Sequence, residues 1–300
     1  MIGEGEVNIR LTENIMLLGN RHFHFYVVGQ KEAAIVECGV SGGVYSLNQQ
    51  WAGLEKKPVI RHLIASHAHF DHVCGIPALR DLYPGAAVVA SSEAQRVLAK
   101  AKVVQNFFEQ DQQMSAVLQA EGIVPEGLVS PHPEIIAVDR IIAGEEIIDL
   151  AGGAQLRAID APGHSPCNLA YYLPQDQVMF VSDAGGFQIA DDTLFPIFFQ
   201  GYELYIETLQ RLRSFPTRVL AIPHERIWRN EEIPAFYDRA IEAARTAYAH
   251  IESMLEGGWE DEDIKRNLFA QYYQGDLRIY SAANINICVE LLMRRVKECL

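Results

Sequence analysis

The chain has 300 residues, of which 49% are apolar and 21% are charged, and this composition excludes wholesale disorder. It carries 25 Lys and Arg against 39 Asp and Glu, which gives a formal net charge of −14. This acidic balance argues against a nucleic-acid partner and against a polybasic membrane-surface protein, because both need clustered basic residues.

The length and the cysteines narrow the class of protein further. The length fits one large domain or two small ones, and no apolar run approaches the roughly 18–20 residues of a membrane-spanning helix. The segment Met1–Arg10 lacks the apolar stretch of a secretory signal. The five cysteines form no C-x-x-C pair, and their odd number favours reduced thiols. We therefore expect a cytoplasmic protein without membrane association.

The first half of the chain alternates short apolar segments with turn residues. Gly19-Asn20 and Gly29-Gln30 separate apolar segments in a way that indicates hairpins. The expected strands are Ile15–Leu18, Phe23–Val28, Ala33–Glu37, His62–Ser66 and Ala86–Ala90, and the expected helices are Gly75–Leu82, Ser92–Lys100 and Val103–Glu121.

A Pro-rich connection, Val124–Pro133, leads into a second strand-rich stretch. The expected strands there are Glu146–Leu150, Gln155–Asp160, Leu169–Leu173, Gln177–Val181 and Arg218–Ile222, with a helix at Glu203–Ser214. Two β-rich halves that each carry helices fit a layered α/β sandwich better than a doubly wound sheet.

After Pro234 the pattern becomes entirely helical. Amphipathic helices are expected at Ala235–Leu255, Glu260–Tyr273 and Ser281–Leu300. We therefore divide the chain into an α/β domain, residues 1–230, and a C-terminal helical extension, residues 231–300, that packs on it. The apolar stripes of the extension could cover the α/β domain or seal a homodimer, and both alternatives remain open.

The segment after the strand His62–Ser66 concentrates residues that bind metals. Three histidines and one aspartate fall within six residues, in the order His67, His69, Asp71 and His72. Imidazole and carboxylate suit Zn, Fe and Mn. In an extended loop His67 and His69 point the same way, while Asp71 and His72 can face a second position. This density disfavours the alternative of a polar loop that is rich in histidine by chance.

Three further candidate ligands follow other predicted strands. His164 lies in Pro-Gly-His-Ser, Asp183 in Ser-Asp-Ala, and His224 in Pro-His-Glu. Each of them alone is more often a turn residue or a helix cap. Together with the cluster they give seven candidate ligands at strand ends, where a layered α/β protein gathers a site from distant segments.

The H-x-H-x-D-H element and its three ordered partners resemble the metallo-β-lactamase-fold hydrolases over about Ile15 to His224. The resemblance implies a four-layer αββα sandwich with a C-terminal helical extension, and a site for two divalent metal ions (Zn, Fe or Mn). All seven ligand positions of that family pattern are filled. The implied roles are one ion held by His67, His69 and His164, a second ion held by Asp71, His72 and His224, and a bridging carboxylate from Asp183.

Three positions beside the ligands depart from the family pattern. Ser66 stands where many relatives have Thr, Asn168 replaces a second His, and Glu225 stands where hydrolytic relatives commonly have Gly. None is a ligand position, so these departures concern the rim of the pocket. Among the neighbouring residues, we expect Cys74 and Cys167 to be packing thiols rather than nucleophiles.

A second, looser resemblance covers Phe180–Leu212, which is similar to the quinolone-signal-response thioesterases with their extra C-terminal helices. The Phe195–Tyr202 loop is rich in aromatic residues, which either attach the helical extension or line an apolar substrate tunnel. Asp160 and Ser165 are candidates for orienting the ligand histidines.

These motifs together predict an enzyme. Two metals about 3.5–4 Å apart can share a hydroxide that attacks a carbonyl carbon, and Asp71 and Asp183 would assist as catalytic carboxylates. We therefore expect a dinuclear metal-dependent hydrolase in which the bridging hydroxide attacks a small-molecule thioester or carboxylic ester. Two alternatives remain: a phosphodiesterase or lactonase on the same site, and a regulatory protein whose hydrolase activity is secondary.

Overall fold

The computed structural model describes residues 9–190 and 193–300. The chain divides into two compact units. The first unit extends to Asp160 and includes Cys167–Ser182 and Leu220–Ile227, and the second comprises Ala161–Pro166, Asp183–Val219 and Trp228–Leu300. The division into residues 1–230 and 231–300 stays a prediction. Among the described residues, no helix combines the length and the apolar character needed to cross a membrane.

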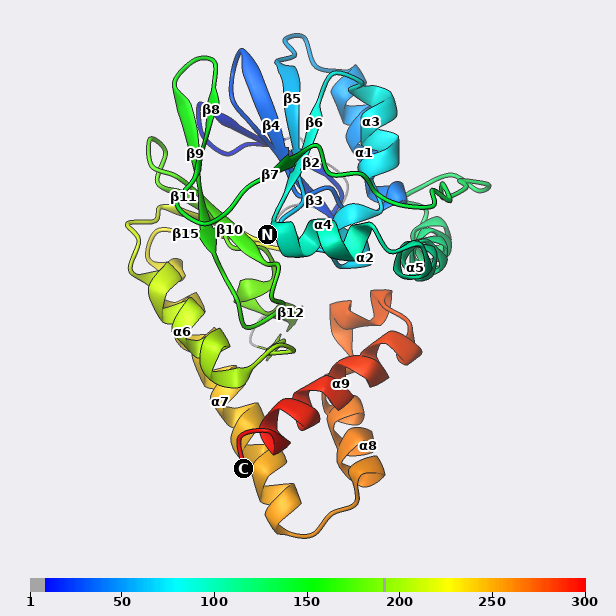
Figure 1. Ribbon diagram of the computed structural model, residues 1–300, viewed down its shortest axis with the longest axis vertical. Helices are drawn as coiled ribbons and strands as arrows, with labels where there is room; N and C mark the ends of the chain where they lie inside the picture. The colour runs from blue at the N-terminus through cyan, green and yellow to red at the C-terminus, as the bar shows by residue number, and fades with distance from the viewer. Residues whose placement is uncertain (1–8, 191–192) are drawn as a thin grey trace. The chain divides into compact units, whose positions relative to one another are not determined.

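Seven strands form a mixed sheet in the first unit (Figure 1). In spatial order they are β1 (Ile9–Arg10), β2 (Ile15–Gly19), β3 (His24–Val28), β4 (Glu32–Val36), β5 (Val59–Ile64), β6 (Ala87–Ala90) and β7 (Arg140–Ile141). Strands β1 to β4 pair antiparallel, which confirms the two predicted hairpins. Strands β4 to β7 pair parallel, so their carboxyl ends lie at one edge of the sheet. The His67–His72 segment follows β5 at this edge.

A second sheet of six strands contains most of the later strands. Its spatial order is β15 (Ile227–Arg229), β14 (Val219–Ala221), β11 (Val178–Phe180), β10 (Leu169–Leu173), β9 (Ala154–Asp160) and β8 (Ile147–Leu150). The rings of Tyr26 on β3 and Phe180 on β11 lie 5.2 Å apart, so the two sheets pack against each other. Every residue of β3 is buried, because helices cover the other face of the first sheet.

Five of the helices in the described part of the chain belong to the first unit. They are α1 (Ser41–Ala52), α2 (Phe70–Val73), α3 (Ile76–Leu82), α4 (Ser92–Leu98) and α5 (Ala101–Ala120). Helix α1 packs on β2 and contacts α3 and α5, and Figure 1 shows α1 and α3 beside the first sheet. Helix α1 was not predicted, because Gly42 and Gly43 weaken its helical pattern. A Cβ atom at Gly42 would lie 2.6 Å from the end of the Leu118 side chain, so the helix packs closely against its neighbour there.

The second unit contains the C-terminal helices. Its elements include the hairpin β12 (Phe187–Ala190) and β13 (Thr193–Phe195), the short helix η2 (Gly275–Ile279), and the helices α6 (Tyr202–Arg213), α7 (Glu232–Glu256), α8 (Asp261–Tyr272) and α9 (Ala282–Lys297). Helix α6 packs against α7, and α9 contacts both α7 and α8. The ring centroids of Phe195 and Tyr272 lie 4.8 Å apart, and those of Phe187 and Tyr280 lie 5.5 Å apart. These contacts support the interpretation that aromatic residues attach the C-terminal helices to the hairpin.

The element order agrees with the expected fold class. Two stacked sheets carry helices, and three long helices complete the chain. The protein is therefore an α/β sandwich with a C-terminal helical region.

Candidate metal centre

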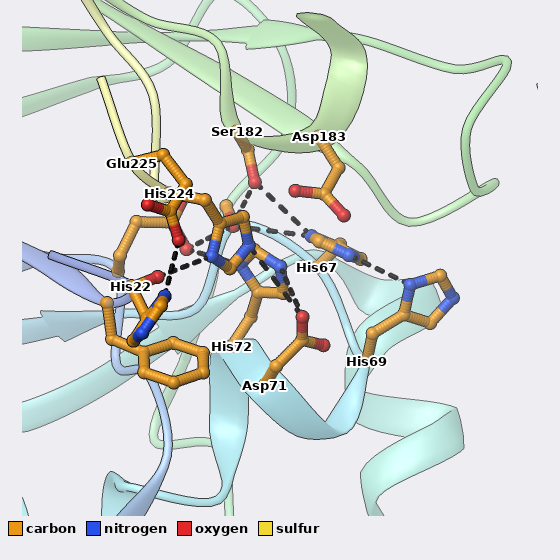
Figure 2. A network of polar contacts seen from close by, with 12 residues as sticks. His22, His67, His69, Asp71, His72, Ser182, Asp183, His224 and Glu225 are labelled. Carbon is orange, nitrogen blue, oxygen red and sulfur yellow. Dashed lines mark hydrogen bonds and ion pairs between the residues drawn. The ribbon is translucent and has the colours of Figure 1, made fainter. Parts of the chain in front are cut away.

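The His67–His72 segment leaves the carboxyl end of β5 and turns into the short helix α2 (Figure 2). His67 Nε2 lies 3.0 Å from His69 Nδ1, so these two side chains point the same way, as predicted. The segment is tied to the second sheet at two points. The Ala68 backbone N–H donates to Cys167 Sγ over 3.3 Å, and the Leu169 N–H donates to the carbonyl of the residue before His67 over 2.9 Å. Cys167 is thus a supporting residue, which agrees with the packing role expected for it.

Asp71, His72 and His224 form a compact group of donor atoms in the first unit. Each residue offers one atom, and the three atoms lie within 4.8 Å of one another. Asp71 Oδ2 is 3.6 Å from His72 Nε2 and 3.7 Å from His224 Nε2. All three residues are buried. The predicted group of one aspartate and two histidines is therefore brought together.

The orientation of His72 is fixed by a residue that the sequence analysis did not identify. Glu37 follows β4, is only 3% exposed, and accepts a hydrogen bond from His72 Nδ1 over 2.8 Å. The same Glu37 oxygen accepts from Ser66 Oγ over 2.9 Å. Because the carboxylate holds the proton on Nδ1, the Nε2 lone pair of His72 faces Asp71.

The orientation of His224 is fixed by the turn between β2 and β3. His224 Nδ1 donates to the His22 carbonyl over 2.8 Å, which leaves Nε2 as the donor atom for a metal. The His24 backbone N–H donates to the Pro223 carbonyl over 2.8 Å, and the Tyr26 hydroxyl donates to the Ile222 carbonyl over 2.5 Å. Residues 22 to 26 therefore hold the His224 loop along its whole length.

A buried ion pair strengthens this attachment (Figure 2). His22 Nδ1 lies 2.5 Å from Glu225 Oε1, and His22 Nε2 lies 2.9 Å from Glu121 Oε2. Burial opposes the charged form of His22, but the two carboxylates outweigh it and raise the pKa of His22. Glu225, the departure from the family pattern beside His224, thus has a structural role in the turn.

His164 and Asp183 lie together in the second unit. His164 Nε2 is 3.4 Å from Asp183 Oδ2, and His164 Nδ1 donates to the Ile197 carbonyl over 3.0 Å. His164 is 2% exposed, and the ring of Phe199 packs 5.3 Å from it. As with His72 and His224, the proton is held on Nδ1, and Nε2 faces a carboxylate.

The donor set fits divalent metal ions. Three histidines have Nδ1 tied to an acceptor and Nε2 turned toward an aspartate, which is the usual arrangement around metal-binding histidines. Imidazole nitrogen and carboxylate oxygen suit Zn, Fe or Mn. The described residues therefore contain His/Asp groups with the chemistry and the support of a metal site.

The orienting role expected for Asp160 and Ser165 stays a prediction. Asp160 Oδ1 accepts from the Gly144 backbone N–H over 3.1 Å. Cys74 is fully buried, and burial raises the pKa of its thiol, as expected for a packing residue. Ser165 and Asn168 are buried as well. Glu37 and the carbonyls of His22 and Ile197 orient three of the histidines, and the Ser182 hydroxyl lies 3.3 Å from His67 Nδ1.

Comparisons with known proteins agree with this geometry. The chain is 26% identical to glyoxylase B2 of Dictyostelium discoideum over 41% of its own length and 37% of that protein. It is 26% identical to hydroxyacylglutathione hydrolase of Hyphomonas neptunium over 45% of its own length and 52% of that protein. The chain thus matches about half or less of the length of these two relatives.

The similarity in structure extends over nearly the whole chain. The crystal structure of the archaeal metallo-beta-lactamase superfamily protein ST1585 from Sulfolobus tokodaii matches with a TM-score of 0.59. The match covers 96% of this chain and 99% of that chain at 19% identity, which supports the fold alone. The model of the metallo-beta-lactamase superfamily matches residues 22–224, which contain every candidate ligand. The chain belongs to the metallo-beta-lactamase superfamily.

Proposed function

We propose that the chain is a dinuclear metal-dependent hydrolase that cleaves a small thioester or carboxylic ester. The observation that carries this proposal is the buried group of Asp71, His72 and His224, with three donor atoms within 4.8 Å of one another. A relative named hydroxyacylglutathione hydrolase supports the substrate class, because hydroxyacylglutathione is a thioester. In this proposal the substrate is a small molecule and the enzyme acts in the cytoplasm.

The second ion would be held by the remaining residues of the sequence pattern. His67 and His69 offer two nitrogen atoms 3.0 Å apart, and His164 and Asp183 offer a nitrogen and an oxygen 3.4 Å apart. We propose that these four residues bind one ion and that the Asp183 carboxylate also binds the second ion. This assignment uses all seven candidate ligands.

The chain's own residues prepare the site for the reaction. When bound, two divalent ions supply a nucleophilic hydroxide at neutral pH and polarise the substrate carbonyl. Glu37 keeps the proton on His72 Nδ1, and the His22 carbonyl does the same for His224. The carboxylates of Asp71 and Asp183 would offset the charge of the ions. We also assign to them the relay of a proton, which is released by the attacking hydroxide and passed to the leaving group.

Metal content tests the dinuclear part of the proposal. Protein purified without added metal is expected to contain about two Zn, Fe or Mn ions per chain by elemental analysis. Removal of these ions by a chelator should abolish hydrolysis, and added metal should restore it. Fewer than about one ion per chain would exclude the dinuclear site.

A substrate panel tests the reaction. We expect turnover of glutathione thioesters or aryl esters, and a loss of about 100-fold in Asp183→Asn. The control is Asp81→Asn, which alters an exposed aspartate on α3 and should keep full activity. If the protein hydrolyses a bis-aryl phosphodiester and none of the acyl substrates, the assignment as a thioesterase or esterase is wrong. A biological role that survives Asp183→Asn would favour a regulatory protein instead.

A further inference from the structure

We infer that Arg295 on the last helix, α9, is a positioning residue for His164, and that it links the C-terminal helical region to this proposed ligand. The inference rests on the metal-binding role proposed for His164. It concerns residues of the second unit only. The chain of contacts runs from Arg295 through the segment 197–200 to the imidazole ring.

Arg295 is held at two points. Its Nε donates to the Phe199 carbonyl over 2.7 Å, and its Nη1 lies 2.5 Å from Glu298 Oε2 on the same helix end. The side chain is 21% exposed, so it reaches into the unit rather than into solvent. Because Nε–H and Nη1 are fixed in one planar group, the ion pair with Glu298 also fixes the direction of the donor toward Phe199.

The peptide groups around Phe199 hold His164 directly. The Ile197 carbonyl accepts from His164 Nδ1 over 3.0 Å and from the Phe199 backbone N–H over 2.8 Å. The Phe199 ring also packs 5.3 Å from the His164 ring. Phe199 therefore lies between Arg295 and His164, with its carbonyl tied to the first residue and its N–H and ring close to the second.

Gln200 extends the attachment to the residue before the ligand. The Gln200 backbone N–H donates to the Gly163 carbonyl over 2.9 Å, and the Gly163 N–H donates to Gln200 Oε1 over 2.8 Å. The segment 197–200 thus contacts the Gly163-His164 dipeptide at three hydrogen bonds. Among the contacts described for this segment, Arg295 is the charged side chain that ties it to a C-terminal helix.

Removal of Arg295 should loosen the segment without removing any ligand. The Ile197 carbonyl would be less well fixed, and the His164 ring would be held less firmly in its metal-binding orientation. Outer partners of a ligand histidine typically affect metal affinity 10- to 100-fold. Since Arg295 acts through one intervening peptide, we expect about a tenfold effect.

The test compares Arg295→Ala with Arg294→Ala in the metal-loaded enzyme. Arg294 lies on the same helix and also pairs with Glu298, over 3.1 Å, but it is 66% exposed. The rate at which an excess of chelator removes the first ion is measured together with urea unfolding. We expect release about ten times faster in Arg295→Ala and an unchanged rate in Arg294→Ala. A purely structural role would lower the urea midpoint and leave the release rate unchanged.

The outcomes separate this inference from the proposed function. Equal release rates in Arg295→Ala and Arg294→Ala would overturn the role of Arg295 and leave the proposed function standing. Full retention of both ions in His164→Ala would overturn the ligand role and the inference with it. If Arg295→Ala does not fold, the second variant is Arg295→Met, which keeps an unbranched stem of similar length but has no N–H donor for the Phe199 carbonyl. The rate of metal release in that variant then tests the role of Arg295.

Discussion

Glu37 Oε2 accepts a hydrogen bond from His72 Nδ1 over 2.8 Å, and the two residues are 35 positions apart in the chain. Glu37 reaches this position with a φ of 71°, in the left-handed region that few non-glycine residues adopt. Such a conformation costs on the order of 1 kcal/mol and occurs where the surroundings require it. In this conformation the Glu37 carboxylate lies within hydrogen-bond distance of both His72 and Ser66.

Glu37→Gln should weaken metal binding by about 10- to 100-fold. An amide oxygen can still accept the hydrogen bond from His72, but it lacks the negative charge that increases the basicity of the ring. The measurement is the metal dissociation constant by competition with a chelator. The control is Glu32→Gln on β4, whose carboxylate pairs with Arg61 at the surface. Equal dissociation constants in the two variants would contradict the assigned role of Glu37.

The local parts of this site could be predicted from the sequence. His67, His69, Asp71 and His72 are identified by spacing within one loop, and the strand Leu169–Leu173 has the predicted limits. These features depend on neighbouring residues and on the period-2 pattern of a buried strand.

The supporting contacts could not be predicted, because they join distant segments. His224 Nδ1 binds the His22 carbonyl across 202 positions, and a carbonyl has no signature in the sequence. Helix α1 was missed for a related reason. A Cβ atom at its Gly43 would lie 3.0 Å from the Phe25 ring, so this glycine fits a close tertiary contact while it weakens the local helical pattern.

Glu225→Gln should destabilise the turn that holds His224. The change removes the charge from the contact of 2.5 Å with His22 Nδ1. Hydrogen bonds to charged groups contribute more than neutral ones, so we expect a loss of about 2 kcal/mol in the free energy of unfolding. Urea unfolding measures this loss. Glu231→Gln, at an exposed position just before α7, is the control and should change the free energy by less than about 0.5 kcal/mol.

Gly163→Ala should disturb the position of His164. Gly163 has a φ of 117°, and a Cβ atom there would lie 2.4 Å from the Tyr205 Cα atom. The control is Gly152→Ala, because Gly152 has nearly the same φ, of 115°, but has no atom within 4 Å of its Cβ position. Both variants share the backbone strain, and only Gly163→Ala adds a clash with a backbone atom.

The difference between the two variants isolates this clash. Overpacking typically costs about 1–3 kcal/mol, so Gly163→Ala should be less stable than Gly152→Ala by about that amount in urea unfolding. It should also bind metal more weakly. Equal stability and equal metal content in the two variants would show that the close approach of Gly163 and Tyr205 is not required.

Asp111 on α5 is a fully buried carboxylate that is not one of the proposed ligands. Its Oδ1 accepts from the backbone N–H of Ser41, the first residue of α1, over 2.9 Å. Burial raises the pKa of the Asp111 carboxyl, although the hydrogen bonds from Ser130 and Ser41 and the proximity of His132 oppose the shift. Cys74 is the other titratable group nearby. The folded protein therefore binds a proton at Asp111 more readily than the unfolded chain does.

This difference in proton binding makes the contribution of Asp111 to stability depend on pH. An acid with a raised pKa in the folded state is most favourable below its unfolded pKa of about 3.9, and it loses this contribution as the pH rises toward the folded value. Asparagine keeps an acceptor for the Ser41 N–H but does not ionise. The free energy of unfolding of Asp111→Asn should therefore increase relative to the wild type between pH 4 and pH 7. Urea unfolding at both pH values measures the change, with Glu109→Gln at an exposed position of α5 as the control. A difference between Asp111→Asn and the wild type that stays constant with pH would mean that burial does not favour the protonated form of Asp111.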